Sequence, residues 1–155
     1  ASKSDWSGAP ELRTERIELL ALLSDPDLHC FSEPRVRKLL DRDPDSRTNV
    51  LLLARVHAQA GRGAEAAALH EQVLERSGTD LLLAREIALA APSPGYQLSP
   101  RLSQAVIAST LDGSAVGSPL TLRFGLECVA RDFERQQRPD AAEATRLTAW
   151  TSLPR

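Results

Sequence analysis

The fold of this 155-residue chain is decided by residues 47–80, RTNVLLLARVHAQAGRGAEAAALHEQVLERSGTD. Apolar side chains recur at helical spacing on both sides of a short turn, Gly61-Arg62-Gly63. This pattern is typical of two amphipathic helices that pack on each other within a unit of about 34 residues. Such a unit leaves apolar surface uncovered, so we expect it to stack on neighbouring helix pairs.

Prolines and capping residues mark further helices on both sides of this unit. Ser99-Pro100 and Ser118-Pro119 each combine a capping side chain with a first-turn proline. Thr79 or Asp80 can cap the helix that ends before Pro92. The expected helices cover about 10–23, 34–43, 48–60, 63–76, 81–91, 100–111, 119–137 and 139–153. No segment alternates with period 2, so the sequence predicts an all-α fold of about eight helices in antiparallel pairs.

Small residues within the unit let its two helices approach closely, and their positions identify a family. Leu53-Ala54 forms a large-small step in the first helix, Glu65-Ala66 follows the turn, and Val73-Leu74 lies near the end. This pattern resembles the tetratricopeptide repeat (TPR) family. The large-small step returns at Ile87-Ala88, 34 residues after Leu53-Ala54. Residues 129–144 echo the motif again, with about two residues inserted.

The resemblance implies a short α-solenoid, in which residues 1–155 form one TPR-like domain and residues 1–9 are flexible. In the family, the first helices of successive units line a groove that binds an extended or helical peptide. The residues expected to contact a protein or peptide partner are Thr48, Leu51, Arg55, Gln59, Arg85 and Leu89. Arg55 can hold a carboxylate with two parallel hydrogen bonds. The alternative is that Arg55 and Arg85 are ordinary solvated side chains.

The sequence shows no catalytic, metal or cofactor motif, so we expect no site of these kinds. His57 and His70 stand where the family packs aromatic side chains between its two helices, and they lack a third ligand at metal-binding spacing. Cys30 and Cys128 lie far apart in apolar surroundings. Two buried thiols are the expected state, with a disulfide or a reactive thiol as the alternative.

Charge and hydropathy narrow the class of partner. The chain has 19 basic and 21 acidic residues, so it has no strongly basic surface for nucleic acid. Its apolar runs are all shorter than the roughly 20 residues of a membrane span, and we expect no membrane segment. A cytoplasmic location is slightly favoured, while a periplasmic or secreted one stays open. Because the chain opens at Ala1, a fragment of a longer protein is one interpretation.

These observations favour a non-catalytic scaffold or adaptor that binds a protein or peptide through a TPR-like groove, within a secretion, envelope or adaptor assembly. One alternative is a regulatory or substrate-recognition domain of a larger enzyme. Another is a self-associating structural module that forms homo-oligomers. An outer face of the last helix with Leu147, Trp150 and Leu153 exposed would favour self-association.

Overall fold

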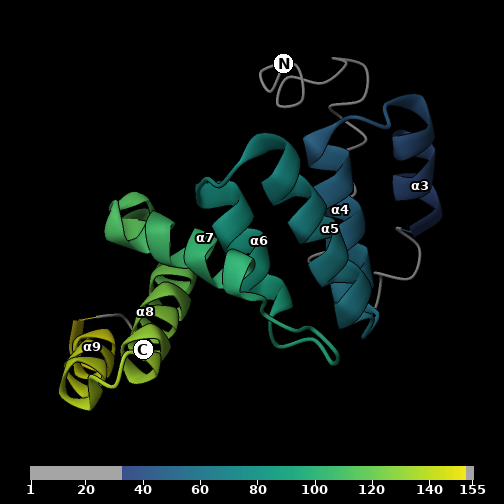
Figure 1. The fold of residues 1–155 in the computed structure, drawn as a ribbon. Helices are drawn as coiled ribbons and strands as arrows, with labels where there is room; N and C mark the ends of the chain where they lie inside the picture. Colours follow the sequence, from purple (N-terminus) through teal and green to yellow (C-terminus); the bar gives the residue numbers. More distant parts are fainter. Residues whose placement is uncertain (1–32, 153–155) are drawn as a thin grey trace. The chain divides into compact units, whose positions relative to one another are not determined.

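The computed structural model describes residues 33–152, which form seven α-helices and one 3₁₀ helix (Figure 1). The elements are α3 (Glu33–Arg42), α4 (Arg47–Gln59), α5 (Gly63–Ser77), α6 (Leu81–Ala90), α7 (Pro100–Leu111), η3 (Ser114–Gly117), α8 (Pro119–Arg135) and α9 (Pro139–Ser152). These described residues contain no strand, and the predicted all-α fold is confirmed. The helix expected at 10–23 lies outside them.

Capping side chains explain why several helices begin where the sequence predicts. Asp80 Oδ1 accepts a hydrogen bond from the Leu83 N–H (3.0 Å), and Ser99 Oγ accepts one from the Leu102 N–H (3.2 Å). Ser118 differs from the expectation, because its hydroxyl bonds the Thr121 hydroxyl (2.9 Å) and caps no backbone N–H. The first turn of α8 is therefore set by Pro119, whose ring fixes the backbone angle that a helix requires.

The chain divides into two compact units. Unit 1 contains the chain up to Gly78 together with Ala90–Leu98, and unit 2 contains Thr79–Leu89 and the chain from Ser99 onward. Unit 1 thus holds α3, α4, α5 and the segment after α6, while unit 2 holds most of α6 and all of α7, η3, α8 and α9. The expectation of one domain over residues 1–155 stays a prediction.

Unit 1 is built on the antiparallel pair α4–α5, with α3 packed on α4. Ala54 on α4 and Ala66 on α5 are both completely buried, as expected for small residues where helix backbones approach closely. A buried cluster joins α3 to α4, and its members are Val36, Leu39, Leu52, Leu53 and Val56. The Asn49 amide donates to the carbonyls of Leu39 (3.1 Å) and Asp43 (3.3 Å), which ties the end of α3 to α4.

The segment after α6 returns to the turn between α4 and α5. The Gly63 N–H donates to the Pro94 carbonyl (2.9 Å), and the Ser93 hydroxyl donates to the Ala58 carbonyl (2.7 Å). A Cβ atom on Gly63 would lie 2.3 Å from the Tyr96 nitrogen. Gly63 is therefore required by this close approach of two backbones.

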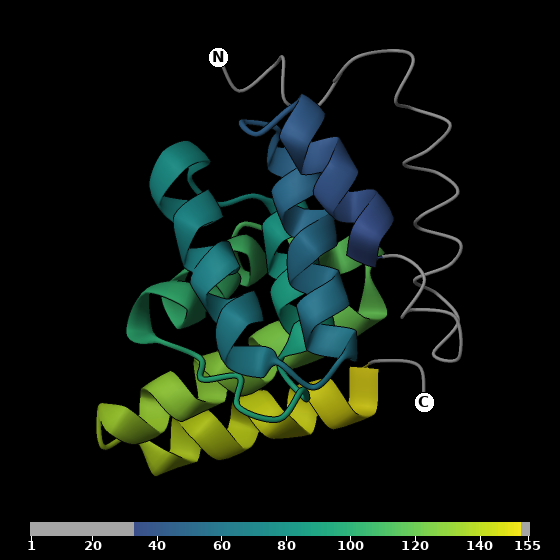
Figure 2. The same cartoon turned by 90° about the vertical axis from the view of Figure 1, so that its right-hand side faces the viewer.

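Unit 2 is held by two helix contacts. α7 crosses α8 where Gly125 meets Thr110, and a Cβ atom on Gly125 would lie 1.7 Å from the Thr110 hydroxyl. α8 and α9 form an antiparallel pair, with their turn at one end and the last turn of α9 at the other (Figure 2). η3 contacts both α7 and α8. It was not among the predicted helices, because its four residues SAVG lie in a stretch that reads as a turn.

Candidate interaction site

The predicted contacts on α4 are mostly covered. Gln59 is exposed, Thr48 and Arg55 are half-buried, and Leu51 is only 3% exposed. The expectation that Leu51 faces a groove therefore disagrees with its burial. The physical reason is the run Val50–Leu53, in which four successive apolar side chains are all buried. These four residues make one full helical turn that is buried on every side, so a register carried over from a family cannot give Leu51 a free face.

The predicted contacts on α6 are exposed. Arg85 is exposed, and Leu89, one helical turn later, is 44% exposed. Leu83, Ala84 and Ile87 on the same helix are completely buried. α6 therefore presents a cation and an apolar side chain on one side of a well-anchored helix. The α4 residues belong to unit 1 and these two belong to unit 2, so each set is described within its own unit.

His57 is part of a polar chain that joins α3 to the end of α4. Its Nδ1 atom accepts a hydrogen bond from Arg62 Nε (2.8 Å), and Arg62 also pairs with Glu33 (3.0 Å). Desolvation and the nearby Arg62 charge lower the pKa of His57. Glu33 bonds Arg37 on its other oxygen, and the hydrogen bonds from Arg37 and Arg62 lower the pKa of that carboxyl. His57 is thus held as a neutral acceptor.

His70 is buried on α5 and bonds a residue from the returning segment. Its Nδ1 atom shares a hydrogen bond with the Tyr96 hydroxyl (2.7 Å), and the two ring centroids are 5.7 Å apart. Burial lowers the pKa of His70 to about 4 and raises the pKa of Tyr96 well above its usual value. The two histidines therefore have different partners, and both occupy buried positions.

Metal-ligating side chains do not cluster in the part of the chain that the structure describes, where no group of three His, Cys, Asp or Glu residues could hold an ion. Cys128 is a free, buried thiol on α8, and burial raises its pKa to about 11. A thiol held in its protonated form is a poor nucleophile. Cys30 and His29 lie outside the described residues.

The turn that ends α4 has a recognisable backbone form. The Arg62 N–H donates to the His57 carbonyl (2.8 Å), the Gly61 N–H donates to the Ala58 carbonyl (3.2 Å), and Gly61 has a φ of 80°. These two bonds around a left-handed residue make a Schellman motif, which satisfies the last carbonyls of a helix. The Arg62 side chain then meets the edge of the His57 ring through its hydrogen bond to Nδ1.

The turn that ends α8 repeats this form 76 residues later. The Arg138 N–H donates to the Phe133 carbonyl (2.9 Å), the Gln137 N–H donates to the Glu134 carbonyl (3.0 Å), and Gln137 has a φ of 59°. The Arg138 guanidinium lies 4.8 Å from the centre of the Phe133 ring. Arginine thus contacts a ring at the same place in both turns.

The two hairpins α4–α5 and α8–α9 correspond residue by residue at this offset. Leu53-Ala54-Arg55 corresponds to Val129-Ala130-Arg131, and Ala66 on α5 corresponds to Ala142 on α9. Ala54, Ala66, Ala130 and Ala142 are all buried. The sequence echo was expected to contain about two inserted residues. The structure corrects this, because the turns and the buried alanines align with no insertion.

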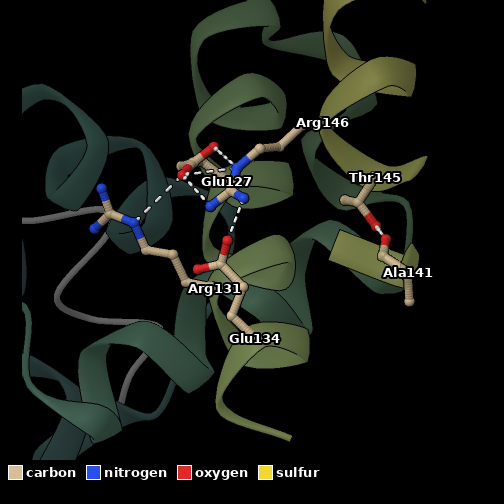
Figure 3. Close-up of polar contacts among 6 residues, drawn as sticks. All are labelled: Glu127, Arg131, Glu134, Ala141, Thr145 and Arg146. Atoms are coloured by element: carbon tan, nitrogen blue, oxygen red, sulfur yellow. Dashed lines mark hydrogen bonds and ion pairs between the residues drawn. The ribbon is translucent and has the colours of Figure 1, made fainter. Parts of the chain in front are cut away.

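The second hairpin is joined by charged side chains (Figure 3). Arg146 on α9 bonds both oxygens of Glu127 on α8 (3.2 and 3.0 Å), and it also bonds Glu134. Arg131 reaches the same Glu127 carboxylate (3.4 Å). The hydrogen bond from Arg146 lowers the pKa of Glu127, and Glu134 and Glu127 together raise the pKa of Arg146. Arg146 occupies the position that corresponds to His70 in the first hairpin.

Several large apolar side chains of unit 2 are exposed. Those on α9 are Leu147 (61%) and Trp150 (70%), which had been named from the sequence, while Leu153 lies outside the described residues. The sequence reasoning missed three others, namely Leu111, Val116 and Leu120. A signal was present, since all three lie in the glycine- and proline-containing stretch LDGSAVGSPL (residues 111–120), where apolar residues have few neighbours in sequence to cover them.

Comparison with protein-family models, curated proteins and solved structures gives no match to this chain. The structure thus establishes paired helices, and the TPR resemblance continues to rest on the sequence pattern. Among residues 33–152, every helix is too short or too polar to cross a lipid bilayer.

Proposed function

We propose that this protein is a non-catalytic helical scaffold that binds a protein or peptide, in the manner of a TPR-like module. The observation that carries the proposal is the internal repeat, in which α4–α5 and α8–α9 share turn bonds, ring contact and buried alanines. Repeated helix pairs stack through their apolar faces and leave the remaining faces for partners. A TPR-like module built on such pairs would present its first helices to a peptide.

The contact surface that we assign to the partner lies on α6. Arg85 and Leu89 are exposed one turn apart, while the opposite side of the helix is completely buried. A cation next to an apolar side chain suits a peptide segment with a carboxylate one turn from a hydrophobic residue. In unit 1, Leu51 is excluded as a contact by its burial, and Arg55 and Gln59 on α4 are secondary candidates considered separately from the α6 surface.

The test is affinity purification with the full chain in its native host, followed by direct binding to the partner that is recovered. The double variant Arg85→Glu/Leu89→Ser reverses the charge and removes the apolar contact at exposed positions, so the fold should be unchanged. We expect it to weaken binding at least tenfold, because both contacts are lost. Lys38→Glu, an equally exposed charge reversal on α3, serves as the control and should bind like the wild type.

Equal binding by the folded double variant and the wild type would show that α6 is not the contact surface. If the reversal at Lys38 weakens binding as much as the α6 variant, the loss is a general charge effect. Either result would remove the assignment of Arg85 and Leu89.

A further inference from the structure

The two hairpins differ in how the outer side of their second helix is covered. On α5, Ala67, His70 and Val73 are buried, and the Tyr96 hydroxyl bonds His70 there. On α9, the corresponding positions 143, 146 and 149 are exposed or half-buried. The side of α5 on which a later segment lies is therefore less covered on α9, where Arg146 bonds Glu127 on α8.

Next to this side, α9 carries two large exposed apolar residues, at positions that correspond to the half-buried Glu71 and Leu74 on α5. Leu147 and Trp150 are three residues apart, so they share one side of the helix. Arg146 faces α8 through its bonds to Glu127, and both Leu147 and Trp150 are exposed. Exposure of 61% and 70% for residues of this size is unfavourable in water unless another surface covers them.

Further exposed apolar residues lie toward the same end of the hairpin. The pair Glu127–Arg146 sets the register of α8 against α9. Trp150 lies about 6 Å beyond Arg146, and Leu120 lies about 10 Å beyond Glu127 in the same direction, at 1.5 Å per residue. Val116 in η3 precedes α8 by three residues and is also exposed. The open end of the α8–α9 hairpin therefore gathers apolar side chains from three elements.

The charge of this region indicates what covers it. Residues 113–122 and 147–152 contain no charged side chain. In a contact between two copies related by a two-fold axis, each patch faces itself, so a strongly charged patch would repel its own copy. Leucine, valine, tryptophan and hydroxyl residues within these ranges carry no such penalty, and the exposed charged residues Asp112 and Arg123 flank the first range.

The size of the patch sets the strength of the contact. With Leu111 included, the five side chains expose roughly 600 Å² on one copy, compared with about 800 Å² per partner in a standard stable interface. Because this exposed area is smaller than that of a standard stable interface, it favours a reversible dimer over a permanent one.

We propose that the uncharged apolar end of the α8–α9 hairpin, centred on Leu147 and Trp150, is a contact surface between two copies of this chain. The dimer leaves Arg85 and Leu89 on α6 uninvolved. It goes beyond the partner binding proposed above, and either inference can fail without the other.

The experiment is sedimentation velocity with the full chain, from about 1 µM to about 500 µM, a range that brackets a micromolar dissociation constant. We expect the wild type to shift from one chain to two with rising concentration. Leu147→Ser/Trp150→Ser should raise the dissociation constant at least tenfold, with an unchanged helical circular dichroism spectrum. Leu89→Ser, an apolar-to-polar change at an exposed position on α6, is the matched control and should dimerise like the wild type.

A second readout follows the environment of Trp150 directly. The chain has two tryptophans, and Trp6→Phe leaves Trp150 as the only one. Its fluorescence should shift to the blue over the same concentrations at which the dimer forms. A wild type that is monomeric throughout, or a dimer that persists unchanged in Leu147→Ser/Trp150→Ser, would overturn the proposal. A different protein that covers Trp150 while the chain itself stays monomeric would also overturn it.

Discussion

The imidazole of His70 is buried in unit 1, where it bonds the Tyr96 phenol. Burial removes water from around the ring, and this desolvation favours the neutral form. Desolvation also lowers the pKa of His57, and the Arg62 guanidinium that donates to its ring adds a second, electrostatic cause. The sequence predicts the same packing role for both histidines, but different neighbouring residues affect their pKa values.

The first prediction concerns the pH dependence of folding. The pKa of His70 is about 4 in the folded chain and near 6.5 when unfolded, so the unfolded chain binds more protons between these values. The contribution of His70 to the free energy of unfolding is therefore fully present above pH 6.5 and is lost as the pH falls toward 4. We expect the free energy of unfolding in urea to fall by about 2 kcal/mol between pH 7.5 and pH 5 from His70 alone.

The matched variant is His70→Gln, whose amide can still bond the Tyr96 hydroxyl but does not titrate. Its free energy of unfolding should depend less on pH than that of the wild type by this amount. The remaining slope has the same sign, because the pKa of His57 is also lowered. Identical slopes for wild type and variant would mean that His70 does not resist protonation in the folded chain.

The helices show which parts of the fold could be read from sequence. The starts of α6 and α7 were predictable, because Asp80 and Ser99 are capping residues whose side chains bond the backbone locally. The burial of Leu51 was not, since the four successive apolar residues Val50–Leu53 give no periodic signal. Arg85 and Leu89 on α6 are exposed as expected, while their contact with a partner stays a prediction.

The second prediction concerns the turn that the two hairpins share. The left-handed position is glycine after α4 (Gly61) but glutamine after α8 (Gln137). A residue with a Cβ loses about 1 kcal/mol of stability in the left-handed conformation. Glycine avoids this strain, but part of the gain is offset because glycine loses more chain entropy on folding. We expect Gln137→Gly to raise the free energy of unfolding by about 0.5–1 kcal/mol, and Gly61→Gln to lower it by about 1 kcal/mol.

Gln136→Gly is the control, because it makes the same change one residue earlier, where φ is −82°. Glycine brings no relief at that ordinary angle, so this variant should be less stable than the wild type. Equilibrium unfolding in urea measures all three variants. The shared-turn interpretation would fail if glycine had the same effect at positions 136 and 137.

At the scale of the whole chain, the most informative features relate residues that lie far apart in the sequence. The 76-residue correspondence of the two hairpins is clear only when turn bonds and buried alanines are compared, since few identical residues carry it. The return of Ser93–Tyr96 to unit 1 gave no sequence signal, because PSPG reads simply as a turn. Such contacts depend on which backbones meet, and a local pattern does not encode that.

The third prediction tests this returning segment through Gly63. A Cβ atom there would lie 2.3 Å from the Tyr96 nitrogen and 2.5 Å from the Pro94 oxygen, and both are backbone atoms that cannot rotate away. We expect Gly63→Ala to push the segment off the α4–α5 turn and to cost about 2–3 kcal/mol of folding free energy. Ala64→Ser, at the exposed neighbouring position, should change it by less than about 0.5 kcal/mol.

Tyr96 is the only tyrosine in the chain, so its titration reports the position of the segment directly. In the wild type and in Ala64→Ser, burial keeps the pKa of Tyr96 well above its usual value, and phenolate absorbance should appear only in strong alkali. In Gly63→Ala the displaced phenol should titrate near its ordinary pKa of about 10, because water again surrounds the charged form. If Tyr96 titrates alike in all three proteins while Gly63→Ala is destabilised, the added methyl acts inside the α4–α5 turn and the segment stays in place.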